Sequence, residues 1–170
     1  MAKNTITEAH LGQLMDTYGT EILRLCYLYL RDYQLAEDAC QDTFIKVYHH
    51  FYQFKGLSSE RTWITKIAIN TCNSYLRNPW KRKVILPTEA NALEKNADTL
   101  LFDELESSEL FQAILQLKKI YKDVILMYYY QAFSVSEIAT ILGISESNAF
   151  TRLCRARKLL KEELGGLIYE

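Results

Sequence analysis

The stretch from Ser134 to Leu160, SVSEIATILGISESNAFTRLCRARKLL, contains two short helical patterns joined by a tight turn. Ser134 and Glu137 have the spacing of a capping box, in which each side chain bonds the other's backbone N–H, so a helix is expected to begin here. Gly143 stands where this helix stops, because glycine adopts a positive φ without a steric penalty. Ser145 is the expected N-cap of the second helix.

The second helix is predicted to have one apolar stripe and one polar, cationic face. At about 100° per residue the stripe comprises Ala149, Leu153, Ala156 and Leu160. The opposite face carries Ser147, Thr151, Cys154 and Lys158, flanked by Asn148, Phe150 and Arg155. Residues 148–161 include five basic residues and no acid. The pattern is typical of a helix-turn-helix whose second helix enters the DNA major groove, although a helical hairpin with a solvated basic face has the same spacing.

Composition indicates a soluble helical protein of one or two small domains. The 170 residues are 49% hydrophobic and 24% charged, and only 6 Gly and 2 Pro argue against a turn-rich β fold. The net charge of −1 hides a local pattern. Residues 1–86 carry 11 basic and 8 acidic groups, residues 87–133 carry 4 and 8, and residues 134–170 carry 5 and 5. Basic charge is therefore concentrated in segments, as a nucleic-acid footprint requires.

Cysteine spacing and the N-terminal sequence point to a reducing compartment. The four cysteines lack a C-x-x-C pair and a partner histidine spacing, and we expect buried or half-buried thiols: Cys26, Cys40, Cys72 and Cys154. A zinc site at His49 or His50 is the less favoured alternative. Nothing resembles a signal peptide or a membrane span, so we expect a cytoplasmic protein without direct membrane insertion. No nucleophile–base pair, metal-ligand set or phosphate loop appears, which predicts no catalytic residue, metal, cofactor or small-molecule substrate.

Helical spacing predicts three further helices before residue 80, over residues 6–30, 34–53 and 60–77. One side of the second helix carries Asp38, Gln41, Asp42, Ile45 and His49. Asp38 and Asp42 repel each other at this spacing. This side is either a solvated surface or a docking surface for a basic partner helix.

The loop Phe54–Ser59 combines an aromatic ring, a cation, a glycine and two hydroxyls. The helix after it turns Arg61, Lys66, Asn70, Asn73 and Arg77 mostly outward. Residues 61–88 hold six basic residues, including the run Lys81-Arg82-Lys83, and no acid. Aromatic rings beside cations suit unstacked single-stranded bases. Trp63 is either such a stacking group or a core side chain, and the core position is favoured.

The segment from Pro87 to about Ser107 turns acidic and is predicted to be a linker, partly helical near residues 99–105. Helical spacing returns over residues 108–131, with a break expected between 118 and 122.

Taken together, these motifs resemble the extracytoplasmic-function, or group 4, sigma factors of bacterial RNA polymerase. The matching runs are AEDACQDTF at residues 36–44, FKG at 54–56, RTWI at 61–64, IAIN at 67–70, YLR at 75–77, SVSEIATILGI at 134–144 and RLCRAR at 152–157. The resemblance implies an all-α fold of two small helical domains joined by a flexible linker. Sigma region 2 would span residues 1–80, the linker 81–107, and sigma region 4 with its helix-turn-helix 108–166.

The resemblance also implies a promoter-specificity factor that is not an enzyme. Core RNA polymerase would be bound by Asp38, Gln41, Asp42 and Ile45. The −10 DNA would be held by Phe54, Lys55, Gly56, Ser58, Ser59, Arg61, Lys66, Asn70 and Asn73. The −35 DNA would be read by Ser147, Asn148, Phe150, Thr151, Arg152, Cys154, Arg155 and Lys158. The implied partners are core RNA polymerase, promoter DNA and an anti-sigma factor, which in this family is often membrane-bound.

Three positions depart from the family pattern. Phe150 stands where a cation is common, and a phenyl ring can contact a thymine methyl but cannot neutralise phosphate. Ile69 stands where arginine is common, and Leu117-Lys118 replaces a common Leu-Pro. The alternative function is a stand-alone helix-turn-helix regulator, which needs neither a docking face nor a base-capturing loop. Such a regulator would bind duplex DNA tightly by itself, whereas a sigma factor of this type would bind weakly without polymerase.

Overall fold

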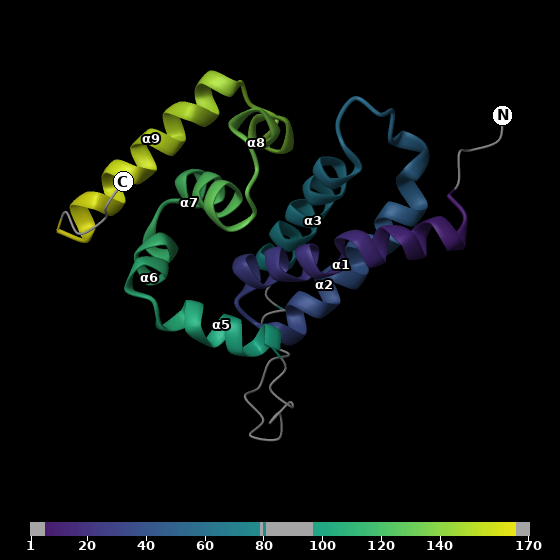
Figure 1. Cartoon of the computed structure of the whole chain (residues 1–170), viewed down its shortest axis with the longest axis horizontal. Coiled ribbons are helices and arrows are strands. Elements are labelled where there is room, and N and C mark those ends of the chain that lie inside the picture. The colour runs from purple at the N-terminus through teal and green to yellow at the C-terminus, as the bar shows by residue number, and fades with distance from the viewer. Residues whose placement is uncertain (1–5, 79, 81–96, 166–170) are drawn as a thin grey trace. The chain divides into compact units, whose positions relative to one another are not determined.

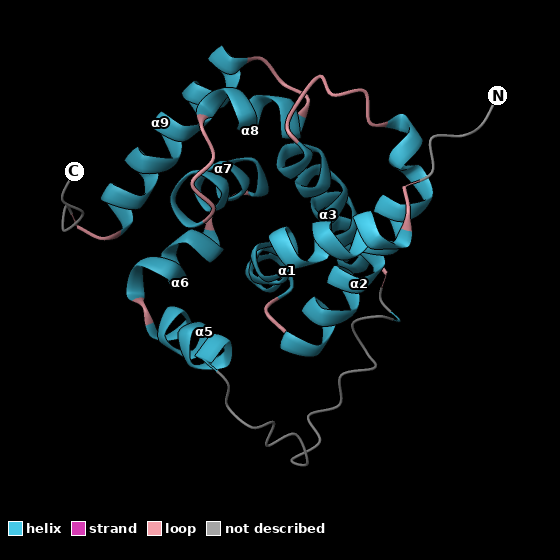
Figure 2. Cartoon of the chain, turned by 45° about the vertical axis from the view of Figure 1, so that its right-hand side comes forward, coloured by secondary structure: helices cyan, strands magenta, loops and turns pink. Residues whose placement is uncertain are grey.

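The computed structural model describes residues 6–78, 80 and 97–165, and these residues form helices, turns and loops without a β-strand (Figure 2). The predicted all-α fold class is therefore confirmed. The chain divides into an N-terminal unit, residues 1–88, and a C-terminal unit, residues 89–170, which are purple to teal and green to yellow in Figure 1. The basic run at residues 81–83 and the first part of the expected linker lie outside the described residues.

Three α-helices make up the described part of the N-terminal unit: α1 (Glu8–Leu30), α2 (Tyr33–His50) and α3 (Glu60–Arg77). Each packs against the other two. The short 3₁₀ turn η1 (Phe51–Gln53) follows α2 directly. α1 runs without interruption through Gly19, so this glycine does not split the helix.

Side-chain caps fix where these helices begin. The hydroxyl of Thr7 accepts from the His10 N–H at 3.1 Å, and the carboxylate of Asp32 accepts from the Leu35 N–H at 2.8 Å. Each cap satisfies one backbone donor that the first helical turn leaves unpaired. Arg31 adopts a left-handed conformation, φ 54°, which reverses the chain between α1 and α2.

The core of the N-terminal unit combines apolar side chains with buried threonines. The Thr43 hydroxyl donates to the Ala39 carbonyl at 2.7 Å, and the Thr71 hydroxyl donates to the Ile67 carbonyl at 2.9 Å. Both hydroxyls are thus satisfied by their own helices, which removes most of the cost of burying them. The buried apolar side chains include Leu14, Ile22, Leu25, Cys26, Ala36, Ala39, Phe44, Val47, Ile64, Ala68, Ile69 and Cys72.

The described part of the C-terminal unit is a succession of short helices that ends in one long helix. They are α5 (Ala97–Ser107), α6 (Glu109–Gln116), α7 (Lys119–Ile125), the π-helical turn η2 (Leu126–Tyr130), α8 (Val135–Leu142) and α9 (Glu146–Glu163). α5 occupies residues 97–107 of the expected linker and packs against α6. The break expected between residues 118 and 122 lies at residues 117–118, between α6 and α7, so it begins one residue before the expected range.

The helix-turn-helix forms as its sequence predicts. The Ser134 hydroxyl accepts from the Glu137 N–H at 3.1 Å, and the Glu137 carboxylate accepts from the Ser134 N–H at 2.8 Å, so the capping box is complete. Gly143 has φ 66°, and the Ile144 N–H donates to the Ala139 carbonyl at 3.0 Å across the turn. This bond closes a Schellman-type helix end and fixes the angle at which α9 starts.

The predicted apolar stripe of α9 is buried along its whole length, from Ala149 to Leu160. It packs against α7 and α8. Phe111, Ile114, Val124, Phe133, Ile138 and Ile141 are further buried side chains of this unit. Burying one face of α9 in this way leaves the opposite face to solvent.

Within residues 6–78 and 97–165, none of the helices has both the length and the apolar character needed to cross a membrane.

Candidate polymerase and DNA interface

The predicted docking side of α2 is open along most of its length. Asp38 and Gln41 are exposed, and Ile45 keeps 54% of its side chain in solvent. An apolar side chain next to acidic and amide groups offers a partner both buried area and complementary charge.

Asp42 differs from its neighbours because it is half-buried and bound within the unit. Its carboxylate accepts a short hydrogen bond from the hydroxyl of Tyr75, which lies on α3 and is buried. Burial, followed by this bond to Asp42, raises the pKa of the Tyr75 phenol. Asp42 therefore joins α2 to α3 in addition to any role at the surface.

An aromatic cluster holds the base of the 54–59 loop. The rings of Phe51 and Trp63 meet edge to face with centroids 5.7 Å apart, and Phe54 lies 5.4 Å from Trp63 and 5.6 Å from Phe51. His10 on α1 adds an edge contact to Phe51, with ring centroids 5.2 Å apart. Edge-to-face packing is favourable because a positive ring edge meets a negative ring face. Trp63 is thus half-buried and anchors the loop.

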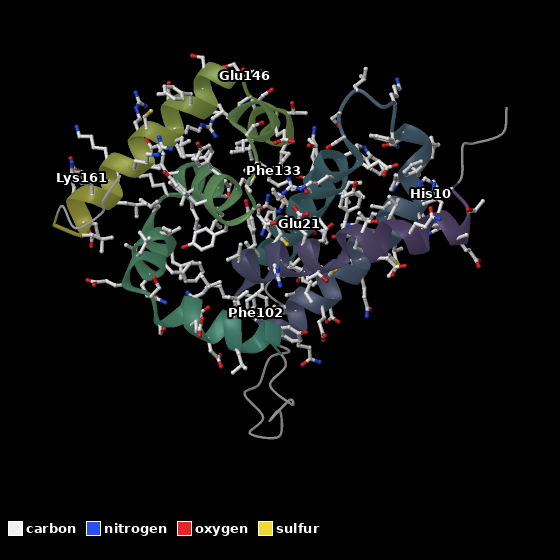
Figure 3. The ribbon with its side chains drawn as sticks, viewed as in Figure 1. His10, Glu21, Phe102, Phe133, Glu146 and Lys161 are labelled. Atoms are coloured by element: carbon white, nitrogen blue, oxygen red, sulfur yellow. The ribbon has the colours of Figure 1, made fainter. Side chains whose placement is uncertain are left out.

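Two pairs of charged or ionisable side chains join the start of α3 to α1. Arg61 donates from Nε and Nη2 to one carboxylate oxygen of Glu21, at 2.6 and 2.5 Å. The labelled Glu21 can be located on α1 in Figure 3. The His10 Nε2 lies 3.7 Å from a carboxylate oxygen of Glu60. Arg61 was predicted as a DNA contact, and in this structure its guanidinium is paired with a carboxylate of its own unit.

The tip of the loop presents an apolar side chain that the sequence reasoning did not select. Gly56 has φ 70°, a conformation that favours glycine, and it turns the chain sharply. Leu57 follows it and is 93% exposed, while Lys55 is also exposed. The Ser59 hydroxyl caps α3 by accepting from the Thr62 N–H at 3.1 Å. The sequence did not indicate a functional role for Leu57, because the loop was interpreted from its polar, charged and aromatic residues.

The outward side of α3 carries the remaining predicted −10 contacts. Lys66 and Asn70 are exposed. Asn73 is half-buried, and its Oδ1 has no hydrogen-bond partner among the described residues. Ile69 is buried in the core, so this position does not face outward and the departure from the family pattern removes no surface cation here.

The predicted DNA face of α9 is exposed almost throughout. Glu146 and Lys161 mark its two ends in Figure 3. Arg152 is half-buried, and its Nε donates to the Asn148 side-chain oxygen at 3.1 Å. The other members of the predicted set are exposed: Ser147, Asn148, Phe150, Thr151, Cys154, Arg155 and Lys158. One helix therefore presents hydroxyl, amide, guanidinium and ammonium groups toward solvent, which is the donor set suited to base edges and phosphates.

Arg157 belongs to the same basic segment but is turned to its own unit. Its Nε donates to the Tyr129 hydroxyl at 2.6 Å, and its guanidinium carbon lies 5.3 Å and 5.5 Å from the ring centroids of Tyr128 and Tyr129. Partial burial alone would lower the pKa of Arg157, but the bonds and charge interactions with the two tyrosines outweigh it and raise the pKa. We call these three residues the tyrosine clamp. It joins η2 to α9.

The four cysteines fall into two environments. Cys26 and Cys72 are buried and Cys40 is half-buried, whereas Cys154 is exposed, so the expectation of buried thiols is wrong for Cys154. A hydrogen bond with Cys72, together with burial, raises the pKa of Cys26. Burial raises the pKa of Cys40 to about 11. A raised pKa keeps a thiol protonated and unreactive.

No group of three or more metal-ligating side chains was found among the described residues, His49 and His50 included.

Family comparisons match both parts of the chain. Residues 14–82 match the family described as sigma-70 region 2, and residues 107–160 match the family described as sigma-70, region 4. The fold is similar to that of CnrH, solved in complex with the cytosolic domain of CnrY, with a TM-score of 0.71, 20% identity, and coverage of 95% of this chain and 92% of that one. It is also similar to RpoE from Bartonella quintana, solved with the anti-sigma factor NepR, with a TM-score of 0.68, 20% identity, and coverage of 94% and 99%.

Closer relatives exist among characterised proteins. The RNA polymerase sigma factor YlaC of Bacillus subtilis is 35% identical over 160 residues, covering 91% of each chain. The extracytoplasmic-function (ECF) RNA polymerase sigma factor SigW of the same organism is 31% identical over 168 residues, covering 92% of this chain and 89% of the relative. The match extends over both units and in the same order. The chain belongs to the extracytoplasmic-function RNA polymerase sigma factors of the sigma-70 superfamily.

Proposed function

We propose that this sigma factor places core RNA polymerase at its promoters by three surfaces on two domains. The exposed side of α2 binds core polymerase, the 54–59 loop with the outward side of α3 holds the opened −10 strand, and α9 reads the −35 duplex. The observation that carries the proposal is the exposed polar face of α9, which has no acidic residue from 148 to 161, on a complete helix-turn-helix. The domains are residues 1–80 and 108–166, with residues 81–107 between them.

Charge and exposure support the polymerase surface. Asp38, Gln41 and Ile45 lie on one side of α2 and are all exposed, so a partner can reach them without rearrangement of the unit. Asp42 is less available to polymerase, because its carboxylate accepts a hydrogen bond from the Tyr75 hydroxyl. The docking role therefore rests mainly on the three exposed residues.

Chemistry supports the −10 surface. Opening promoter DNA costs base stacking, and a protein that binds an extruded base offsets part of this cost. The loop offers an exposed cation, an exposed leucine and two serines. Its ends are held in place by the aromatic contacts among Phe51, Phe54 and Trp63. A loop whose ends are held in place loses less conformational entropy on binding DNA than a flexible loop does.

The direct test is runoff transcription with purified core polymerase on genomic promoter fragments. Addition of the protein should produce transcripts that start at defined sites and that core polymerase alone does not make. The protein itself performs no chemistry in this reaction. A stand-alone regulator would bind duplex DNA without polymerase and would give no new start sites, and that result would contradict the proposal.

Surface variants separate the roles. Asp38→Lys should weaken binding to core polymerase about tenfold, since it places a cation where a basic partner docks. Asp16→Lys makes the same charge change at an exposed site on α1 and should leave binding unchanged. Equal effects of the two variants would reject the α2 surface. Replacing residues 54–59 by the loop of another family member should alter −10 preference without altering −35 preference.

We further propose regulation by an anti-sigma factor. Two proteins of the same fold were solved with such partners or with a cytosolic partner domain. The protein would then act in the cytoplasm and be held inactive there, at the membrane if its partner is anchored. Fractionation of native cells tests this, since a tagged protein should shift from the bound to the free pool when its promoters are induced.

A further inference from the structure

Phe150 is an apolar residue on the polar side of α9. It lies in the second turn of the helix and keeps 55% of its side chain in solvent. Within the described part of the chain, its ring stacks on no other aromatic or cationic group. The fold of the unit therefore gives no reason for a phenyl ring at this position.

The outward side of α9 divides into two halves. At about 100° per residue, Asn148, Arg152 and Arg155 fall on one flank. The hydrogen bond from Arg152 to Asn148, 3.1 Å, pairs two of these three side chains. The other flank carries Ser147, Phe150 and Cys154, spaced at three and four residues, so the phenyl ring lies between a hydroxyl and a thiol.

One cation close to Phe150 on this flank is bonded within its own unit. Arg157 follows Phe150 after two turns, and the tyrosine clamp holds its guanidinium against η2. Lys158 is exposed one turn beyond Cys154, so this flank keeps a cation toward its C-terminal end, while the position of Phe150 itself offers no polar group. A phenyl ring cannot supply hydrogen bonds to a base edge, and covering a polar edge with it would leave that edge unsatisfied.

The major groove exposes one apolar group on the bases, the 5-methyl group of thymine. We propose that Phe150 selects thymine at one position of the −35 element by covering this methyl group. The inference rests on the proposed −35 role of α9 and deepens it, because it assigns one base identity to one side chain. Any other base at that position would lose the apolar contact.

The test uses the reconstituted holoenzyme, since the free protein is expected to bind promoters weakly. A promoter is first selected from a random DNA library by the wild-type holoenzyme, with core polymerase alone as the background. Each thymine of the −35 element, on both strands, is then replaced singly by deoxyuridine. This change removes the methyl group and keeps every hydrogen-bonding group. At one position it should weaken wild-type binding roughly fourfold, the effect of burying one methyl-sized group.

Two variants complete the experiment. Phe150→Ala should bind thymine and deoxyuridine at that position equally. Leu159→Ala removes an exposed apolar side chain from the opposite flank of α9 and should keep the wild-type discrimination. The inference is overturned if the wild-type holoenzyme is indifferent to every substitution, if Phe150→Ala still discriminates, if Leu159→Ala loses the discrimination, or if the selected element contains no A·T pair. A library that yields no promoter above background overturns the proposed function itself.

Discussion

The 54–59 loop and helix α9 carry the two proposed DNA contacts, and they are held in different ways. The loop has no regular hydrogen-bond ladder, and its position depends on side chains of other elements, the aromatic cluster and the Glu21–Arg61 pair. α9 takes its shape from its own backbone, its cap at Ser145 and a buried stripe on the side away from DNA. Substitutions around the loop should therefore affect both folding and DNA opening, whereas substitutions on the face of α9 should affect DNA alone.

The largest effect is expected at the anchor of the loop. Trp63→Ala removes the ring that contacts Phe51 and Phe54, and should lower the free energy of unfolding by about 2–3 kcal/mol. It should also abolish opening of the −10 region, measured with a fluorescent base analogue in the promoter. Trp80→Ala is the matched control, because Trp80 is exposed and its loss should change stability by less than about 0.5 kcal/mol. Full −10 opening by Trp63→Ala would show that the cluster does not position the loop.

Two arginines on α9 test the other half of the comparison. Arg155 is exposed on the DNA face, so Arg155→Ala should cost about 1–3 kcal/mol of −35 binding with no loss of stability. Arg157 is held by the tyrosine clamp, so Arg157→Ala should lower the free energy of unfolding by about 1–2 kcal/mol.

Arg157→Lys keeps the charge but loses the planar fork, and should fall between wild type and Arg157→Ala in stability. Urea unfolding followed by circular dichroism and promoter binding by the holoenzyme are the two measurements. A stability loss for Arg155→Ala equal to that for Arg157→Ala would remove the distinction between the two positions.

A smaller effect is expected from the ion pair that joins α3 to α1. A double-mutant cycle with Glu21→Gln and Arg61→Gln should give a coupling energy of about 1 kcal/mol, since both side chains are only partly shielded from water. The single variants should slow promoter opening in proportion to their loss of stability. An effect of Arg61→Gln on opening that is independent of Glu21 would instead assign the guanidinium to DNA.

The smallest effect concerns the turn before α8. Ala132 has φ 54°, a conformation that costs an alanine energy because of its Cβ. Ala132→Gly should raise the free energy of unfolding by about 0.5–1 kcal/mol and leave promoter binding unchanged. Ala156→Gly is the control, because Ala156 is a buried residue inside α9 and its replacement should destabilise by about 1 kcal/mol. Destabilisation by Ala132→Gly would contradict the strained conformation.

Features set by neighbours in the sequence were predictable. The capping box at Ser134, the turn at Gly143 and the buried stripe of α9 were all expected, and the structure confirms them. Each depends on residues within one or two helical turns, where spacing alone decides which side chains meet. The family was also predictable, because two sets of such motifs occur in the correct order.

Features that join distant segments were not predictable. The Arg61–Glu21 pair spans 40 residues and the Arg157–Tyr129 bond spans 28. In the sequence, nothing marks Arg61 as bound within its own unit. Helical spacing separates Arg157 from Arg155 but gives no sign of its tyrosine partners. Only the packing of helices reveals that two of these three arginines face their own unit. Residue type predicted burial of Cys154, although helical spacing placed it on the outward face, and the exposure of Leu57 was not predicted. Residue type indicates average burial and not the burial of a particular site.

The π-helical turn at residues 126–130 constrains the number of residues that this segment can contain. Its five-residue hydrogen-bond spacing accommodates one residue more than an α-helical turn would. Loss of a single residue there would convert the π-helical turn into an α-helical one. This would rotate the two tyrosines relative to each other and break their contacts with Arg157 on α9. A change that alters no side chain's chemistry would thus change the direction of the helix proposed to read the −35 DNA. Insertions and deletions in this short segment should be rarer among functional variants than substitutions at any of its individual positions.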